Sequence, residues 1–240
     1  MDRKAVTSRD NHEQAGTIGK SGAIVLSLLF GGLLLGLAAP RLVTQYLMLS
    51  GDPVLSAIEK GREVSADELR RLILSRQRGL TWADSGPARV ELAIAQILLA
   101  EREVGGGARY HELMQQAVAS LRDGLAQAPA DPFAWTRLAY ADLAEAAPAR
   151  RVVPILAMAI ETAPVQPTLV FPRLELCLME WPYFARAHPA LFTGQLRVAW
   201  REDPRRLVRL ARLAGRTDAV REALVDDDRR DFDRLAQERD

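Results

Sequence analysis

An uncharged apolar run near the N-terminus constrains this chain more than any other feature. Residues 21–40 read SGAIVLSLLFGGLLLGLAAP and contain no Asp, Glu, Lys, Arg or His. At about 1.5 Å per residue, a helix of this length reaches about 30 Å, the thickness of the hydrocarbon core of a bilayer. The helices of a globular domain rarely lack a polar face over such a length. The run therefore predicts a single transmembrane helix over residues 21–40, preceded by a polar tail over residues 1–20.

Two alternatives remain for this segment, a retained anchor and a cleaved signal peptide. The sequence GLA at residues 36–38 is a small-x-small site of the kind that signal peptidases cut. The polar tail, however, is long for a signal peptide and contains acidic residues, and apolar residues continue past Pro40 to Leu49. We expect a retained anchor, with Tyr46 at the membrane interface.

The distribution of cationic residues predicts the orientation of this helix. Four of them precede the run, at positions 3, 4, 9 and 20, whereas Arg41 is the single one between the run and Lys60. By the positive-inside rule, the N-terminal tail is cytoplasmic and the rest of the chain lies across the membrane. The excess of Arg (29) over Lys (3) is typical of a GC-rich bacterial genome. We therefore expect a single-pass protein of the bacterial inner membrane with a periplasmic C-terminal domain.

Two glycines within the run, Gly32 and Gly36, form a GxxxG motif. Small residues at this spacing let two membrane helices approach closely. The motif would support a homodimer through the transmembrane helix, and the alternative is that glycine is simply frequent in such helices.

Beyond Ser50 the sequence predicts helices throughout, because no run of alternating Val, Ile or Thr indicates a strand. Residues 41–86 form a membrane-proximal helical segment, in which Ser65 and Glu68 have the spacing of a helix-capping box. Pro87 then opens a strongly apolar helix, and three glycines at residues 105–107 end it. The predicted fold class is all-α.

A repeat follows, carried by apolar or small residues at spacings of four, three and five. The three sets are Ala117, Leu121, Gly124 and Pro129; Val152, Leu156, Ala159 and Pro164; and Phe192, Leu196, Ala199 and Pro204. In each set, a helix presents one apolar face and a proline stops it. The prolines lie 35 and 40 residues apart, a spacing typical of solenoids of helix pairs.

Residues 87–204 resemble tetratricopeptide repeats (TPR), and residues 131–164 (DPFAWTRLAYADLAEAAPARRVVPILAMAIETAP) are the best match. The residues that match the family signature are Trp135, Leu138, Ala139, Leu156, Ala159 and Pro164. The match needs one extra residue in the turn at 147–150, and the flanking repeats are degenerate. The resemblance implies an α-solenoid of helical hairpins whose matching positions are structural.

The resemblance also implies a binding surface, because the first helices of successive hairpins in this family line a concave groove. It places Phe133, Arg137 and Tyr140 of one repeat, with Phe171 and Glu175 of the next, near that groove. Aromatic rings beside an arginine and a glutamate suit a peptide or a partner helix. The alternative is that the two phenylalanines merely pack between helices.

The C-terminal segment, residues 205–240, combines a basic helix with an acidic tail. The face formed by Arg205, Arg209, Arg212 and Arg216 would contact an anionic ligand such as a lipid headgroup, an acidic polysaccharide or an acidic partner. The alternative is a solvated, solubilising face. Acidic residues dominate after Arg221, and we expect that tail to fray and to screen the basic face.

Composition and motifs exclude several classes of protein. A net charge of +1 argues against a nucleic-acid-binding protein, and the single cysteine, Cys177, excludes a disulfide framework and a multi-cysteine metal site. Neither a nucleophile motif, a zinc motif nor a phosphate-binding loop is present. We expect no metal, no cofactor and no enzymatic activity.

The expected function is therefore a membrane-anchored scaffold or adaptor of the bacterial cell envelope, which binds a membrane-associated partner protein. Polysaccharide biosynthesis or export is the process suggested by analogy of architecture. The alternative is a chaperone-like module that presents extended or cofactor-receiving polypeptides, as in cytochrome assembly. A third hypothesis is an enzyme that uses Glu175 and a second groove carboxylate.

Overall fold

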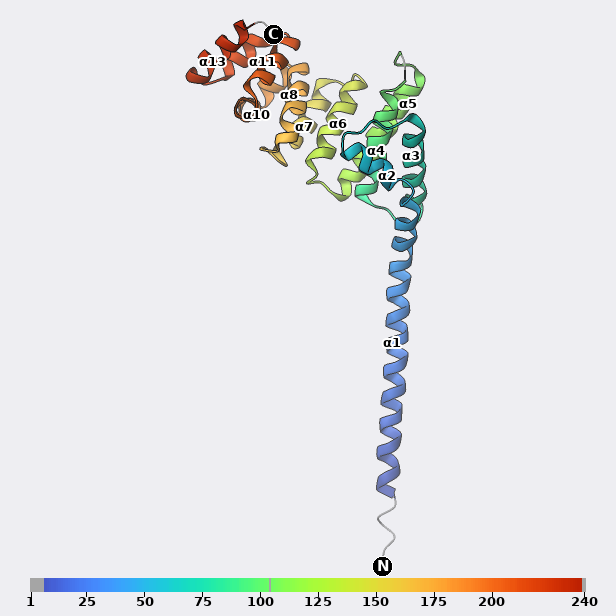
Figure 1. Ribbon diagram of the computed structural model, residues 1–240. Coiled ribbons are helices and arrows are strands. Elements are labelled where there is room, and N and C mark those ends of the chain that lie inside the picture. The colour runs from blue at the N-terminus through green and yellow to red at the C-terminus, as the bar shows by residue number, and fades with distance from the viewer. Residues whose placement is uncertain (1–6, 104, 239–240) are drawn as a thin grey trace, which may run out of the picture.

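The computed structural model describes residues 7–103 and 105–238, in which every regular element is an α-helix (Figure 1). A long N-terminal helix projects from a body of helical hairpins. The helices are α1 (Thr7–Met48), α2 (Asp52–Glu59), α3 (Ala66–Leu80), α4 (Gly86–Ala100), α5 (Ala108–Gln127), α6 (Pro132–Ala144), α7 (Ala149–Glu161), α8 (Pro167–Met179), α9 (Tyr183–Ala187), α10 (Pro189–Glu202), α11 (Pro204–Leu213), α12 (Thr217–Ala223) and α13 (Asp226–Gln237).

Helix α1 contains a stretch that is long and apolar enough to cross a membrane. This stretch is Val25–Met48, 24 residues with a mean hydropathy of 1.8, and none of its most apolar window is buried within the protein. The helix begins before the predicted boundary at residue 21 and continues through Pro40 to Met48. A proline is tolerated here because it costs one backbone hydrogen bond, which neighbouring groups in membrane helices commonly replace.

The end of α1 is joined firmly to the body through α3. Thr44 and Met48 are buried, and the Thr44 hydroxyl donates a hydrogen bond to the carbonyl oxygen of Gly79 over 3.1 Å. A side chain at Gly79 would meet Met48, because an added Cβ would lie 2.5 Å from the Met48 Cε. The absence of a side chain at Gly79 therefore lets α1 and α3 approach closely.

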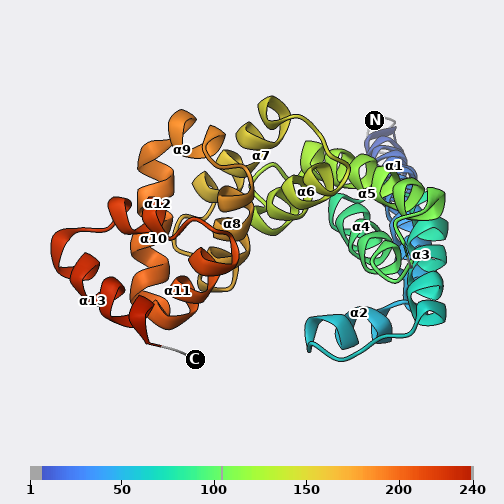
Figure 2. The same cartoon turned by 90° about the horizontal axis from the view of Figure 1, so that it is seen from above.

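The body is an arc of stacked hairpins with an inner and an outer row of helices (Figure 2). Helices α4, α6 and α8 form the inner row, and each packs against an outer partner: α5, α7 and α10 respectively. The repeat found in the sequence is confirmed on the outer helices, because all nine of its non-proline positions are buried there. Its three prolines follow the ends of α5, α7 and α10 within two or three residues.

Side-chain caps explain where several of these helices begin. Ser65 and Glu68 form the predicted capping box of α3. The carboxylate of Asp131 accepts hydrogen bonds from two backbone amides of α6, and that of Asp203 caps α11. The predicted glycine break lies in the turn between α4 and α5, where Gly105 and Gly106 have φ values of 85° and 63°. Only glycine adopts such values readily, so neither α4, which ends at Ala100, nor α5, which begins at Ala108, extends through this turn.

The C-terminal segment differs from the expected frayed tail. Helix α13 packs on the body through Phe232, which is fully buried beside Trp200 at a ring distance of 6.2 Å. The carboxylate of Asp233 accepts a hydrogen bond of 2.7 Å from the guanidinium of Arg221. The acidic composition suggested a frayed end, but Phe232, with Leu235 and Ala236 beside it, packs one face of α13 on the core.

Candidate functional site

A cavity of about 480 Å³ lies on the concave side of the arc. It is lined by Ile58, Ile94, Ile97, Leu98, Glu101, Phe133, Thr136, Arg137, Tyr140, Leu169, Pro172, Glu175, Leu176 and Met179. These residues come from α2 and from the three inner helices α4, α6 and α8. The lining is mostly apolar, with a few charged and hydroxyl groups among the aliphatic side chains.

One face of each inner helix lines the cavity. The lining residues are 94, 97 and 98 of α4 with Glu101, the C-cap of that helix; 133, 136, 137 and 140 of α6; and 172, 175, 176 and 179 of α8. The spacing of three, one and three places these residues on one face of each helix. The sets do not occupy the same turn of each helix, because residues 133 and 172 lie 39 apart whereas α6 and α8 begin 35 residues apart, at Pro132 and Pro167.

Four of the five residues predicted for the groove lie together in this cavity: Phe133, Arg137, Tyr140 and Glu175. The prediction for Phe171 is wrong, because this residue is buried in the core and does not line the cavity. Phe171 precedes Pro172 by one position, which turns it about 100° around the helix axis, away from the cavity. The guanidinium of Arg206 covers its ring at 4.2 Å, so the packing alternative holds for this residue.

Two hydroxyl groups of the cavity, those of Thr136 and Tyr140, are hydrogen-bonded within the chain, and Arg137 has no carboxylate within ion-pair distance among the described residues. The Tyr140 hydroxyl donates a hydrogen bond of 2.7 Å to Glu101, and burial together with this contact raises the pKa of Tyr140. Burial lowers the pKa of Arg137, whose guanidinium lies 5.8 Å from the Phe133 ring. The cavity thus offers Arg137 and Glu175 as charged contacts for a ligand.

The sequence did not indicate the part of the cavity that comes from α2 and α4. Ile58, Ile94 and Glu101 lie in or beside the degenerate first repeat, where no signature residue marks the register. The one usable signal was the spacing, since residues 94, 97, 98 and 101 are spaced like residues 133, 136, 137 and 140 of the next inner helix. It was hidden because the residue types differ and the sets lie at different turns of their helices.

The structure does not preserve the predicted basic face as one continuous stripe. Arg205 lies 3.6 Å from Glu238, and Arg209 is exposed on the same helix, α11. Arg212 donates hydrogen bonds to the carbonyl oxygens of residues 235, 236 and 238, at the C-terminal end of α13. Arg216 lies beyond α11, as the N-cap of α12. Contacts within the chain therefore occupy part of this face. Arg212 binds backbone carbonyl oxygens at the end of α13, where a helix leaves its last carbonyl groups without partners of its own.

The glycines of the membrane motif, the cysteine and His111 do not line the cavity. Gly32 and Gly36 are in the projecting part of α1, and no atom of the described residues lies within 4 Å of a Cβ added to either. Cys177 is fully buried, and burial raises the pKa of its thiol. His111 lies on the outer row, 2.8 Å from Glu145. Within the described residues, no group of three His, Cys, Asp or Glu side chains is arranged to hold a metal ion.

Comparisons with known proteins leave the cavity as the main guide to function. No protein-family model matches the chain, and a search of curated proteins finds no similar sequence. What the geometry provides is an apolar cavity built by three consecutive hairpins, attached firmly to a helix long enough to cross a membrane.

Proposed function

We propose that this protein is a membrane-anchored, non-enzymatic scaffold of the bacterial cell envelope that binds one segment of a partner protein in its concave cavity. The observation that carries this proposal is the shared lining, in which one face of each of the three inner helices α4, α6 and α8 borders one space. A surface repeated along a solenoid suits an elongated ligand, because each hairpin contributes a similar contact at a regular distance. We also assign the hairpins to the TPR-like class, because the buried positions of the outer helices follow the spacing of that repeat.

The chemistry of the lining defines the partner segment. Aliphatic and aromatic side chains form most of the cavity, so the segment presents apolar side chains to it. Glu101 and Glu175 outnumber Arg137, which favours a basic residue in the segment. Phe133, Tyr140 and Met179 are partly exposed at the cavity and supply the aromatic and thioether contacts typical of peptide grooves.

The anchor gives this binding site its location. The four cationic residues before the apolar run favour a cytoplasmic N-terminus, which places the body in the periplasm and makes the protein single-pass in the inner membrane. The α1–α3 contact holds the cavity at a fixed distance from the bilayer. A role in polysaccharide biosynthesis or export is proposed by analogy with other anchored helical subunits.

Site-specific photocrosslinking in intact cells tests the proposal. A photoreactive amino acid replaces Phe133 or Met179 at the cavity, and Leu213, the most exposed hydrophobic residue of α11, serves as the control position. We expect one discrete adduct from both cavity positions and none of the same mass from position 213. Adding Arg137→Glu and Tyr140→Ala should abolish that adduct without changing the amount of membrane-bound protein.

The outcome also separates the scaffold from its alternative. A single partner that co-purifies with the detergent-solubilised protein supports a scaffold. A ladder of many adducts, competed by an unfolded polypeptide, would instead identify a chaperone-like module. Equal crosslinking from positions 133 and 213 would contradict binding in the cavity.

A further inference from the structure

Helix α3 runs back along α1 toward the part of α1 that enters the membrane. The guanidinium of Arg76 donates a hydrogen bond of 2.7 Å to the carbonyl oxygen of Met48, at the end of α1. Three residues further along α3, the carbonyl oxygen of Gly79 accepts a hydrogen bond from Thr44, which lies one turn earlier on α1. The two helices are therefore antiparallel, and the end of α3 points toward the bilayer.

The depth of this contact follows from the length of the apolar stretch. The hydrocarbon core needs about 20 helical residues at 1.5 Å each. If those residues are 25–44, Thr44 lies at the boundary of the core; if they are 21–40, Thr44 lies about 6 Å outside it. Both placements put Gly79, beside Thr44, within the headgroup layer. The next residues of the chain share this depth, because the backbone amide of Trp82 donates a hydrogen bond of 3.0 Å to Gly79.

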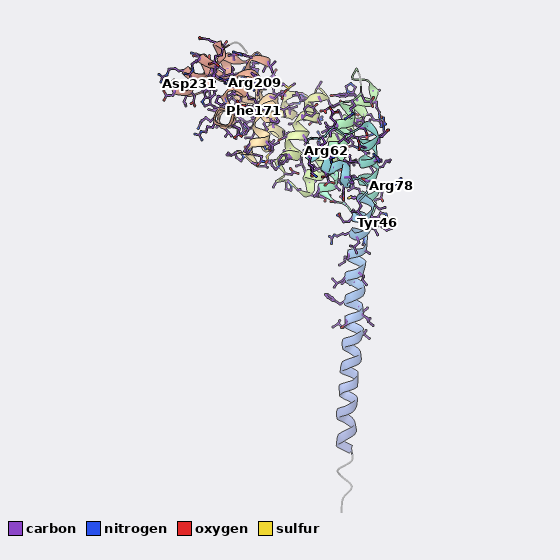
Figure 3. The ribbon with its side chains drawn as sticks, viewed as in Figure 1. Tyr46, Arg62, Arg78, Phe171, Arg209 and Asp231 are labelled. Carbon is purple, nitrogen blue, oxygen red and sulfur yellow. The ribbon has the colours of Figure 1, made fainter. Side chains whose placement is uncertain are left out.

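The side chains at this level suit a membrane interface. The ring of Trp82 is 58% exposed and that of Tyr46 is 75% exposed, although both are large aromatic groups. Trp and Tyr are enriched where a membrane protein meets the headgroups, since their rings are apolar and their N–H or O–H groups are polar. Arg41 and Arg78 are exposed nearby in the sequence, and Figure 3 places Tyr46 and Arg78 where α1 enters the body.

The polar groups around Trp82 are satisfied within the chain, which leaves the indole as the group that faces outward. The Thr81 hydroxyl donates to the carbonyl oxygen of Arg78 over 2.7 Å. Asp84 accepts hydrogen bonds from Arg89 and Gln127, and the Arg89 guanidinium lowers the pKa of that carboxyl group. No hydrogen bond from the Trp82 indole is formed within the described part of the chain. Because these polar groups are hydrogen-bonded within the chain, the segment can lie close to the hydrocarbon core.

We propose that residues 77–85, here called the interfacial loop, bind the lipid surface, with the Trp82 ring inserted among the headgroups and Arg78 facing the lipid phosphates. This inference rests on the proposed anchoring of α1. It gives the body a second attachment to the bilayer beside the transmembrane helix, so that the arc cannot rotate freely above the membrane. The cavity is then presented to partners at a fixed angle as well as a fixed height.

Fluorescence quenching in vesicles of phosphatidylethanolamine and phosphatidylglycerol tests this attachment. The full chain is labelled with a polarity-sensitive fluorophore at Thr81→Cys, at Leu213→Cys as the distant control, or at Leu35→Cys inside α1. Native Cys177 is buried and does not compete for the label, and the parent protein measures the background. The quenchers are a headgroup nitroxide lipid, an acyl-chain nitroxide lipid and aqueous iodide.

We expect the headgroup nitroxide to quench the label at position 81 several-fold more than the label at 213, and iodide to do the reverse. Adding Trp82→Ser to Thr81→Cys should reduce the difference. Identical behaviour of positions 81 and 213, with the label at 35 quenched by the acyl-chain nitroxide, would overturn the interfacial loop and leave the anchor intact. A label at 35 that iodide quenches and lipids do not would overturn both.

Discussion

Arg76 is the residue whose replacement should most damage the junction between the anchor and the body. Its side chain is only 2% exposed, although it is a cation. It donates hydrogen bonds to the carbonyl oxygen of Met48, to Asp52 over 2.8 Å and to Glu91 over 2.6 Å. One guanidinium thus connects α1, α2, α3 and α4. Replacing it by methionine keeps most of the volume and removes all three contacts.

The cost of Arg76→Met follows from the exposure of its partners. The hydrogen bond to the Met48 carbonyl at the end of α1 is worth about 1.5–3 kcal/mol, because its donor is charged and buried. The side chains of Asp52 and Glu91 are 53% and 28% exposed, so water replaces much of each ion pair and each contributes at most about 1 kcal/mol. The total is about 3 kcal/mol. This free-energy cost lowers the local stability of α3 and of its contact with α1.

Hydrogen exchange of the full chain in nanodiscs measures this loss. A cost of about 3 kcal/mol corresponds to roughly 10²-fold faster exchange of the α3 amides, since each 1.4 kcal/mol is a factor of ten. Arg70→Met is the matched control, because Arg70 lies on the same helix in an exposed pair with Asp67. The control should change exchange by less than about threefold. Equal protection of α3 in the two variants would refute the role assigned to Arg76.

Three further predictions concern packing, pH and thiol reactivity. Gly124→Ala should lower the free energy of unfolding by about 1–3 kcal/mol in denaturant titrations, because the new Cβ would lie 2.9 Å from Val90 and 3.1 Å from the Gly86 backbone oxygen. The pKa of Asp84 is lowered by Arg89 from its usual 3.8, so the pair stabilises the fold above that pH and the benefit is lost as pH falls through the lowered pKa. Asp84→Asn should therefore reduce Tm slightly at pH 7 and less at pH 3. Cys177, whose burial raises its pKa, should react with maleimide in denaturant and remain unmodified in the native protein.

Much of the fold was predictable because it depends on local patterns. The capping box at Ser65 and the proline-terminated repeats fix where helices begin and end, and these patterns operate within one turn or one hairpin. The part of the groove formed by α6 was predictable for the same reason. Phe133, Arg137 and Tyr140 share one face of α6, and that face follows from the helical period alone.

Other features needed contacts between segments distant in the sequence. Phe171 was assigned to the groove through the resemblance to tetratricopeptide repeats, and the packing of α8 instead turned it into the core under Arg206. Arg212 was assigned to a basic surface, whereas its partners lie more than twenty residues later, at the end of α13. The acidic tail folds because Phe232 finds a hydrophobic site, which charge patterning does not reveal.

The sequence by itself determined an all-α chain with an apolar N-terminal helix and a hairpin repeat. Each of these depends on hydrophobic periodicity and backbone chemistry, which are local properties. Only the tertiary structure decided which side chains share the cavity, how Arg76 joins α1 to the body, and at what depth Trp82 lies relative to Thr44. Those outcomes depend on the close approach of helices through residues such as Gly79, and close approach is a property of the whole packing arrangement.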